Sequence, residues 1–91
     1  MAFALEYGSP INLTASGIVS KVSGNLLGFY VNSTNAGTIV LRGGTVAGST
    51  AISGTITPAI GWREFPAEMP NGCYATIGGV ALDVTFIFSA T

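Results

Sequence analysis

Glycine interrupts this chain so often that no long helix fits between its positions. The 91 residues include 13 glycines and four prolines, and no long window repeats apolar residues at helical spacing without a glycine or a β-branched run. Between these breaks lie short runs rich in β-branched and aromatic residues, at the spacing typical of sandwiches and barrels. We therefore predict an all-β fold: a small single-domain β-sandwich or barrel, spanning residues 1–91, of about seven or eight short antiparallel strands.

The first clear strands are residues 25–31 (NLLGFYV) and 38–42 (TIVLR), which flank the turn-rich sequence NSTNAG. Aromatic and β-branched residues favour strands, and we expect these two runs to pair as a hairpin. In the second run, Ile39 and Leu41 share one face because side chains alternate along a strand. The pair Gly43-Gly44 is expected to end it.

A second hairpin is predicted at the end of the chain, where residues 73–77 (CYATI) and 81–88 (ALDVTFIF) are joined through Gly78-Gly79. The even-numbered residues of the last strand are all large and apolar, and we expect that face to be core. These residues are Leu82, Val84, Phe86 and Phe88.

The remaining segments are less regular. Residues 2–7 and 11–22 both look extended and are divided by the turn signal Gly8-Ser9-Pro10. Residues 51–57 (AISGTIT) are expected to form a strand that ends at Pro58. Residues 60–72 contain the only Trp, three of the seven charged residues and two of the four prolines. We interpret them as a long shaped loop or a strand with a bent exit.

The residues that carry chemistry are few. The chain has no His and one Cys, Cys73, so Ser-His and Cys-His catalysis, an intrachain disulfide and a thiolate zinc site are excluded. Glu64 and Glu68 would need a separation of about 5 to 10 Å to act as a glycosidase pair, and two exposed loop carboxylates are the simpler interpretation. We predict no enzyme, no catalytic residues, no metal and no cofactor.

The charge balance also limits the partners. A net charge of -1 offers no basic footprint for nucleic acid. No apolar run approaches the length of a membrane span, and the N-terminus has no charged-then-apolar signal segment. We therefore expect no nucleic-acid partner and no membrane partner, and synthesis in the cytoplasm.

Charged residues make up 8% of the chain and apolar residues 48%. Soluble monomers carry far more surface charge, so we expect much of this surface to face other proteins in a homo-oligomer. The alternative is a monomer whose surface is covered by Thr, Ser, Asn and Gly.

Two groups of residues are candidates for a protein interface. Trp62, Arg63, Glu64 and Phe65 bring together the aromatic and Arg side chains that concentrate at interface centres. The alternative is that Trp62 and Phe65 cap the core. Asp83 lies in an apolar strand and needs solvent or a partner. Arg42 is one possible partner.

Three stretches, covering about residues 17 to 90, resemble small proteins encoded among the structural genes of tailed bacteriophages. These are SGNLLGFYVNSTNAGTIVLRGG, SGTITPAIGWREFPAEMPNGCYATIGG and LDVTFIFSA. The shared pattern is a GTIxLxxG strand, a TITP-aromatic-FP segment, an NGxYATIGG turn and a DVTF closing strand.

This resemblance implies a virion component made in the host bacterial cytoplasm and no catalytic residues. The resemblance implies either a head protein or a small protein of the tail or neck. The expected role is an oligomeric decoration or cement protein that stabilises the phage head by bridging subunits of the major capsid protein. A homotrimer is favoured, because decoration sites lie at three-fold positions of the shell. The alternative is a receptor- or glycan-binding module of a tail or head fibre, in which Tyr30, Trp62 and Tyr74 would stack on a ligand.

Overall fold

The computed structural model describes residues 8–90, and every regular element among them is a β-strand. The strands are β1 (Ser9–Leu13), β2 (Gly17–Ser20), β3 (Gly24–Arg42), β4 (Gly61–Met69) and β5 (Cys73–Ala90). β3 and β5 are 19 and 18 residues long, far beyond the usual length of about five or six. They pair antiparallel with each other from one end to the other, and the all-β prediction is confirmed.

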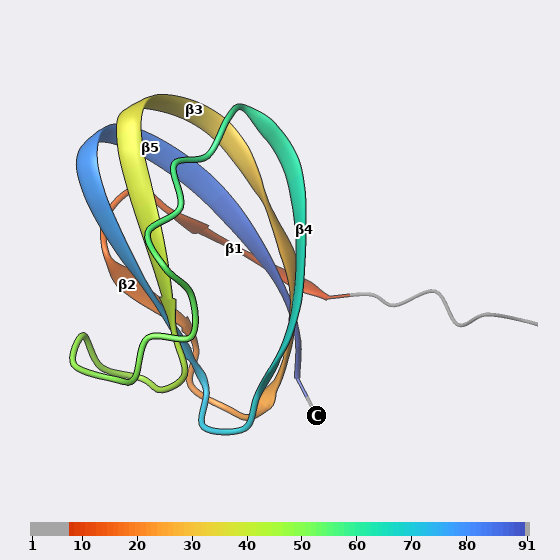
Figure 1. The fold of residues 1–91 in the computed structure, drawn as a ribbon. Helices are drawn as coiled ribbons and strands as arrows, with labels where there is room; N and C mark the ends of the chain where they lie inside the picture. The colour runs from red at the N-terminus through yellow and green to blue at the C-terminus, as the bar shows by residue number, and fades with distance from the viewer. Residues whose placement is uncertain (1–7, 91) are drawn as a thin grey trace, which may run out of the picture.

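The long strands bend together at their middle, where both arch over the top of the molecule (Figure 1). The pairing register shifts three times between Val31 and Thr38 of β3. Ala36 and Gly79 have positive φ angles of 58° and 81°. A Cβ at Gly79 would collide with the carbonyl oxygen of Ala36, so this crossing needs glycine. Each long strand consequently contributes one half to each of two layers.

The first layer has the strand order β1-β5-β3-β4. It contains residues 24–31 of β3 and 83–90 of β5, which pair with β4 on one side and β1 on the other.

The second layer contains the other halves of β3 and β5. Here β2 pairs with the beginning of β5, and the segment before β4 joins β3 through the isolated bridges Ile39↔Ile56 and Arg42↔Ala51. When each half of β3 and β5 is counted separately, seven strand segments form two packed layers, which agrees with the predicted sandwich.

The core lies between the two layers and consists of apolar side chains. The expected alternation of the last strand is confirmed, since all four even-numbered residues from Leu82 to Phe88 are buried. Ile39 and Leu41 are also buried, as expected for one face of their strand. The full core is Val19, Leu26, Phe29, Val31, Ile39, Leu41, Met69, Cys73, Ala75, Leu82, Val84, Phe86 and Phe88.

Both predicted hairpins are wrong. Residues 25–31 and 38–42 do not pair with each other, because both belong to β3 and pair with β5. Residues 73–77 and 81–88 are likewise two parts of β5. The small and turn-forming residues between them do not reverse the chain. They allow two paired strands to bend together where backbones approach closely.

Three other segments can be compared with the sequence prediction. Residues 51–57 form two isolated bridges to β3 and no continuous strand. Residues 60–72 contain β4, so the strand was the correct one of the two predicted forms. The turn predicted at Gly8-Ser9-Pro10 is wrong, because Ser9 and Pro10 begin β1 and pair with β5. Residues 11–22 contain the rest of β1, a bend and β2, whereas residues 2–7 lie outside the described part of the chain.

Candidate interaction face

The four adjacent interface candidates lie on β4, and the strand divides them between its two sides. Trp62 and Glu64 are exposed on the outer side of the first layer, whereas Phe65 is half-buried against the core. Arg63 is exposed and pairs in register with the buried Phe29. Of the proposed core caps, Phe65 packs against the core and Trp62 does not.

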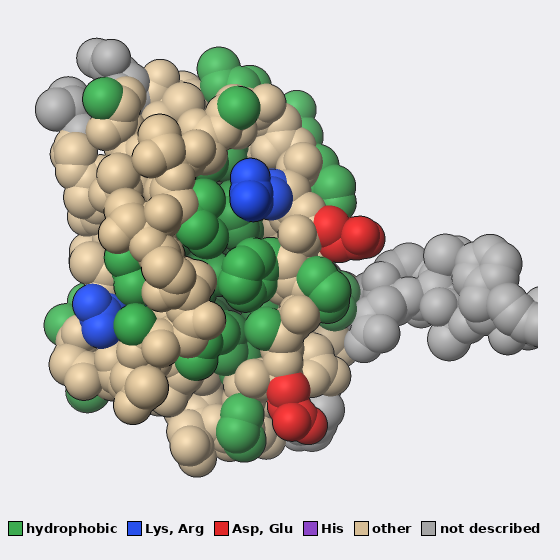
Figure 2. All heavy atoms as spheres, viewed as in Figure 1, with side chains coloured by type: hydrophobic (Ala, Val, Ile, Leu, Met, Phe, Trp, Pro, Cys, Tyr) green, Lys and Arg blue, Asp and Glu red, His purple; other side chains and the backbone are tan. Residues whose placement is uncertain are grey.

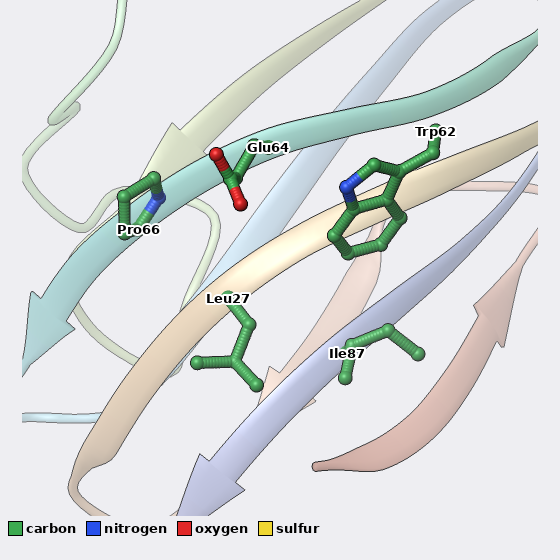
Figure 3. Close-up of a pocket in the computed structure, with 5 residues that line it drawn as sticks. All are labelled: Leu27, Trp62, Glu64, Pro66 and Ile87. Atoms are coloured by element: carbon green, nitrogen blue, oxygen red, sulfur yellow. The ribbon is translucent and has the colours of Figure 1, made fainter. Parts of the chain in front are cut away.

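Trp62 and Glu64 line an open depression of about 290 Å³. The other lining residues are Leu27 of β3, Pro66 of β4 and Ile87 of β5. Figure 3 shows the indole ring extending from β4 across β3 toward Ile87, with the Glu64 carboxylate and Pro66 further along the same strand. The depression is therefore largely apolar and has one acidic wall.

Gly28 determines where the indole ring lies. A Cβ at this position would be 2.7 Å from two atoms of the Trp62 six-membered ring and 2.5 Å from the Arg63 carbonyl oxygen. The ring occupies the space that a side chain at position 28 would fill, an arrangement in which an aromatic residue covers a strand glycine. One side of the indole is covered by the sheet, and half of the side chain, 50%, remains exposed.

Sequence alternation does not predict that Leu27 lines this depression. The register between β3 and β5 shifts between Leu26 and Gly28, so that one extra residue is accommodated as a β-bulge. Leu26 is buried in the core, and Leu27 points to the outer side with Gly28. Ile87 and Pro66 were also missed, although the alternation of β5 places Ile87 opposite the core residues.

Tyr30 lies beside Trp62 on the same face. The two residues are register partners on β3 and β4, and Tyr30 is 46% exposed. Register pairing extends the row across the layer through Thr85 to Asn12. We call this outer side of the first layer, with Tyr30, Trp62 and the depression, the aromatic face.

Asp83 lies on the aromatic face in a cluster of polar side chains. Asn12 Nδ2 donates hydrogen bonds to Asp83 Oδ1 at 2.7 Å and to Thr85 Oγ1 at 3.2 Å. Asn32 Nδ2 donates to the same two oxygen atoms at 3.2 and 3.1 Å. The side-chain amides of Asn12 and Asn32 thus bind the Asp83 carboxylate, for which Arg42 was the predicted partner.

The Arg42–Asp83 pair is wrong because the two residues belong to different layers. Asp83 is opposite Ser33 near the bend, whereas Arg42 is opposite Tyr74 at the far end of the β3–β5 pair. Arg42 Nε donates to Thr76 Oγ1 at 2.8 Å and its Nη1 to the Ser49 carbonyl oxygen at 3.0 Å. The third aromatic of the glycan hypothesis, Tyr74, is also on this second layer, apart from Tyr30 and Trp62.

We call the outer side of the second layer the Arg42 face. Its central row is Ile18, Tyr74, Arg42 and Ala51, which are neighbours in register. Ile18 is 36% exposed, and Tyr74 and Arg42 are half-buried. Exposed Lys21 follows β2 at the edge of this layer.

The described acidic side chains all belong to the first layer. Glu64 and Glu68 lie on the outer side of β4, and Asp83 lies on the same face of β5. Figure 2 shows acidic side chains along the side where β4 runs, with a basic side chain near them and another basic side chain on the opposite side. The molecule therefore presents an acidic aromatic face and a basic Arg42 face.

The described residues contain no cluster of three His, Cys, Asp or Glu side chains that could hold a metal ion. Cys73 is buried in the core, and burial raises the pKa of its thiol from 9.0 to about 12. A thiol in this environment is protonated at neutral pH and is a poor nucleophile. No helix in the described part of the chain could span a membrane.

Comparisons with protein-family models, with curated proteins and with solved structures found no match to this chain.

Proposed function

We propose that this chain is a non-enzymatic structural subunit of a phage virion. Its role would be that of an oligomeric decoration or cement protein, with a trimer favoured, that stabilises the head by bridging subunits of the major capsid protein. The motif resemblance described above supports the virion assignment. The low charge of the surface supports association with other proteins.

The observation that carries the proposal is the aromatic face. Trp62 and Tyr30 are register neighbours on the outer side of the first layer, each about half exposed, beside a depression lined by Leu27, Pro66 and Ile87. Exposed Trp and Tyr are typical of interface centres. Seven charged residues share an accessible surface of 5011 Å², about one per 700 Å², so this surface favours contact with protein.

The direct test compares heads of the encoding phage with and without this protein. We expect shells that lack it to open at a lower temperature and at a lower chelator concentration, and purified protein added back should bind and restore the resistance. Apolar burial contributes about 25 cal/mol per Å². The stabilisation from a modest contact therefore becomes large when the contact is repeated over the many subunits of a shell. Equal fragility of the two kinds of shell, measured by calorimetry and electron microscopy, would contradict the proposal.

A glycan-binding module is the second candidate, and the position of the indole favours it. Trp62 covers Gly28 with one side and leaves the other accessible, with Glu64 and Pro66 further along its strand. Aromatic rings and carboxylates on one open face suit a sugar, whose apolar side stacks while its hydroxyls donate hydrogen bonds.

A glycan array read with wild-type protein and a Trp62→Ala variant separates the two candidates. A fibre module binds at least one glycan and loses that binding with the indole. A cement protein binds naked shells and no glycan.

A further inference from the structure

The charged side chains of the two faces are complementary. The aromatic face carries Glu64, Glu68 and Asp83, and the Arg42 face carries Arg42, with Lys21 at its edge. Opposite charges across an interface orient the partners and suppress wrong pairings. Two copies that meet aromatic face to aromatic face would instead bring like charges together.

Arg42 is positioned to contact a partner. The side chain is held by Thr76 through Nε and by Ser49 through Nη1, so its orientation is defined before any partner arrives. Within the described part of the chain these bonds use two of its three nitrogens, which leaves Nη2 for a partner. A guanidinium group held in this way loses little conformational entropy on binding.

The depression on the aromatic face provides matching groups. Its indole ring suits a cation, since Arg stacks on the faces of aromatic rings, and Glu64 beside it suits a charge-assisted hydrogen bond. Ile18 and Tyr74 lie beside Arg42 on the Arg42 face. They could pack against the apolar side chains that line the depression.

The outer edge of β4 is a poor site for pairing with another strand. β4 contains Pro66 and the charged residues Arg63, Glu64 and Glu68, and proline with charge is how edge strands avoid pairing with other chains. Contact through faces is therefore favoured over contact through this edge. A standard interface takes about 800 Å² from each partner, about a sixth of the 5011 Å² surface.

We infer that copies of this chain associate head to tail, with the aromatic face of one copy seated on the Arg42 face of the next. The inference rests on the proposed oligomeric function, because a contact between two different patches joins identical subunits into a ring or an open stack, whereas a self-complementary patch produces dimers. Arg42 of one copy contacts Trp62 and Glu64 of its neighbour.

The test uses charge reversal and sedimentation velocity on the full chain. Arg42→Glu and the double change Glu64→Lys with Glu68→Lys should each weaken self-association at least about tenfold, the effect of losing about 1.4 kcal/mol. Mixing these two variants restores one wild-type pairing, and the mixture should form a complex that neither variant forms alone. The three changes combined in one chain should associate again, because the charges are exchanged.

Arg63→Glu is the matched control, since it reverses a charge on β4 away from the depression and should leave association unchanged. Thermal melting verifies that each variant folds. Because Arg42 is half-buried, Lys21→Glu provides an exposed second variant of the Arg42 face and should weaken association, although less. Raising the salt concentration should weaken the wild-type assembly.

The possible results separate this inference from the proposed function. If the double variant Glu64→Lys, Glu68→Lys dissociates while Arg42→Glu and Lys21→Glu associate like wild type, the aromatic face contacts its own copy. The head-to-tail arrangement is then wrong. A mixture of the two variants that stays monomeric would also contradict the head-to-tail arrangement. A wild-type chain that is monomeric at every concentration overturns self-association, and the shell experiment then still decides whether the protein stabilises a capsid.

Discussion

The two halves of β3 both contribute buried side chains to the core, but they differ in the partners along their edges. Residues 24–31 have a strand partner on both sides, with β5 on one side and β4 on the other. Residues 38–42 have β5 on one side, while the other side has two isolated bridges and a hydrogen bond from Leu41 N to Ser53 Oγ at 2.9 Å. Even so, Phe29 in the first half and Ile39 in the second are both fully buried.

This difference indicates that core burial does not require a regular edge. Side-chain alternation along β3 and β5 is sufficient to fill the core, because each long strand already pairs with the other. The edges decide what the outer surfaces look like. The regular edge, β4, carries Trp62 of the aromatic face, and the irregular edge supplies the Ser49 carbonyl oxygen that accepts a hydrogen bond from Arg42. Four predictions test this separation of core from edge.

The largest expected effect is in the core, and it should be similar in both halves. Phe29→Ala should lower the free energy of unfolding by about 3 to 5 kcal/mol and Ile39→Ala by about 2 to 5, because each leaves a cavity in a fully buried site. Phe29 also contacts Phe86, with ring centroids 5.6 Å apart. Urea denaturation measures both. Tyr30→Ala, on the outer side, is the control and should cost less than about 1 kcal/mol. If Ile39→Ala also costs less than about 1 kcal/mol, the irregular half contributes little to the stability of the core.

The second prediction concerns the pH dependence of stability at Cys73. Burial raises the pKa of its thiol from 9.0 to about 12, so the unfolded chain releases this proton before the folded chain does. The resulting stabilisation is fully present below pH 9 and is lost as the pH rises toward 12, at about 1.4 kcal/mol per pH unit. Stability measured across this window should therefore fall more steeply for wild type than for Cys73→Ala. Parallel curves for the two proteins would place the thiol in contact with water.

The third prediction compares two glycines, one beside each kind of edge. Gly28→Ala should destabilise by about 1 to 3 kcal/mol, the usual cost of overpacking, because its Cβ would meet the Trp62 ring and the Arg63 carbonyl oxygen. Gly54 lies in the irregular segment with nothing within 4 Å of an added Cβ. Gly54→Ala should stay within about 0.5 kcal/mol of wild type. Equal melting temperatures for the two variants would contradict the close packing at the regular edge.

The smallest effect is expected at the irregular edge itself. Ser53→Ala removes the acceptor of the Leu41 backbone N–H and should cost about 1 to 2 kcal/mol, since a partly buried donor loses its partner. Thr55→Ala, an exposed change in the same segment, should remain within about 0.5 kcal/mol. The Leu41 amide should also exchange its hydrogen faster in the Ser53 variant. Unchanged exchange would mean that the serine is not needed for this edge.

Several features of the fold were predictable because they depend on residues close together in the sequence. The alternation around Ile39 and Leu41 and along 82–88 correctly predicted the core faces. Gly43-Gly44 correctly predicted the end of β3 at Arg42. The hairpins were wrong because a run such as NSTNAG permits either a reversal or a bend, and only the pairing of β3 with β5 chooses the bend.

The candidate site was predicted in part for the same reason. Trp62 and Glu64 were identified from composition. Their separation from Arg63 and Phe65 follows from strand alternation, but only the pairing of β4 with β3 shows which of the two sides faces outward. Leu27 was missed because alternation counted from the core residues Phe29 and Val31 would bury it, and the bulge between Leu26 and Gly28 reverses that order. The prediction that Arg42 pairs with Asp83 was wrong because the sequence pattern of a strand does not indicate which parts of two strands lie side by side.

The amino-acid sequence was enough to establish the β-rich character of this protein, many residues of its core, and a surface with unusually few charges. These follow from side-chain chemistry and the two-residue period of a strand, which are local properties. Three features became visible only in the folded chain: two long strands bend together into both layers, an indole covers Gly28, and acidic and basic side chains lie on different faces. The reason is physical: register, bulges and bends are set by contacts between residues far apart in the chain, and those contacts decide which surfaces remain available to a partner.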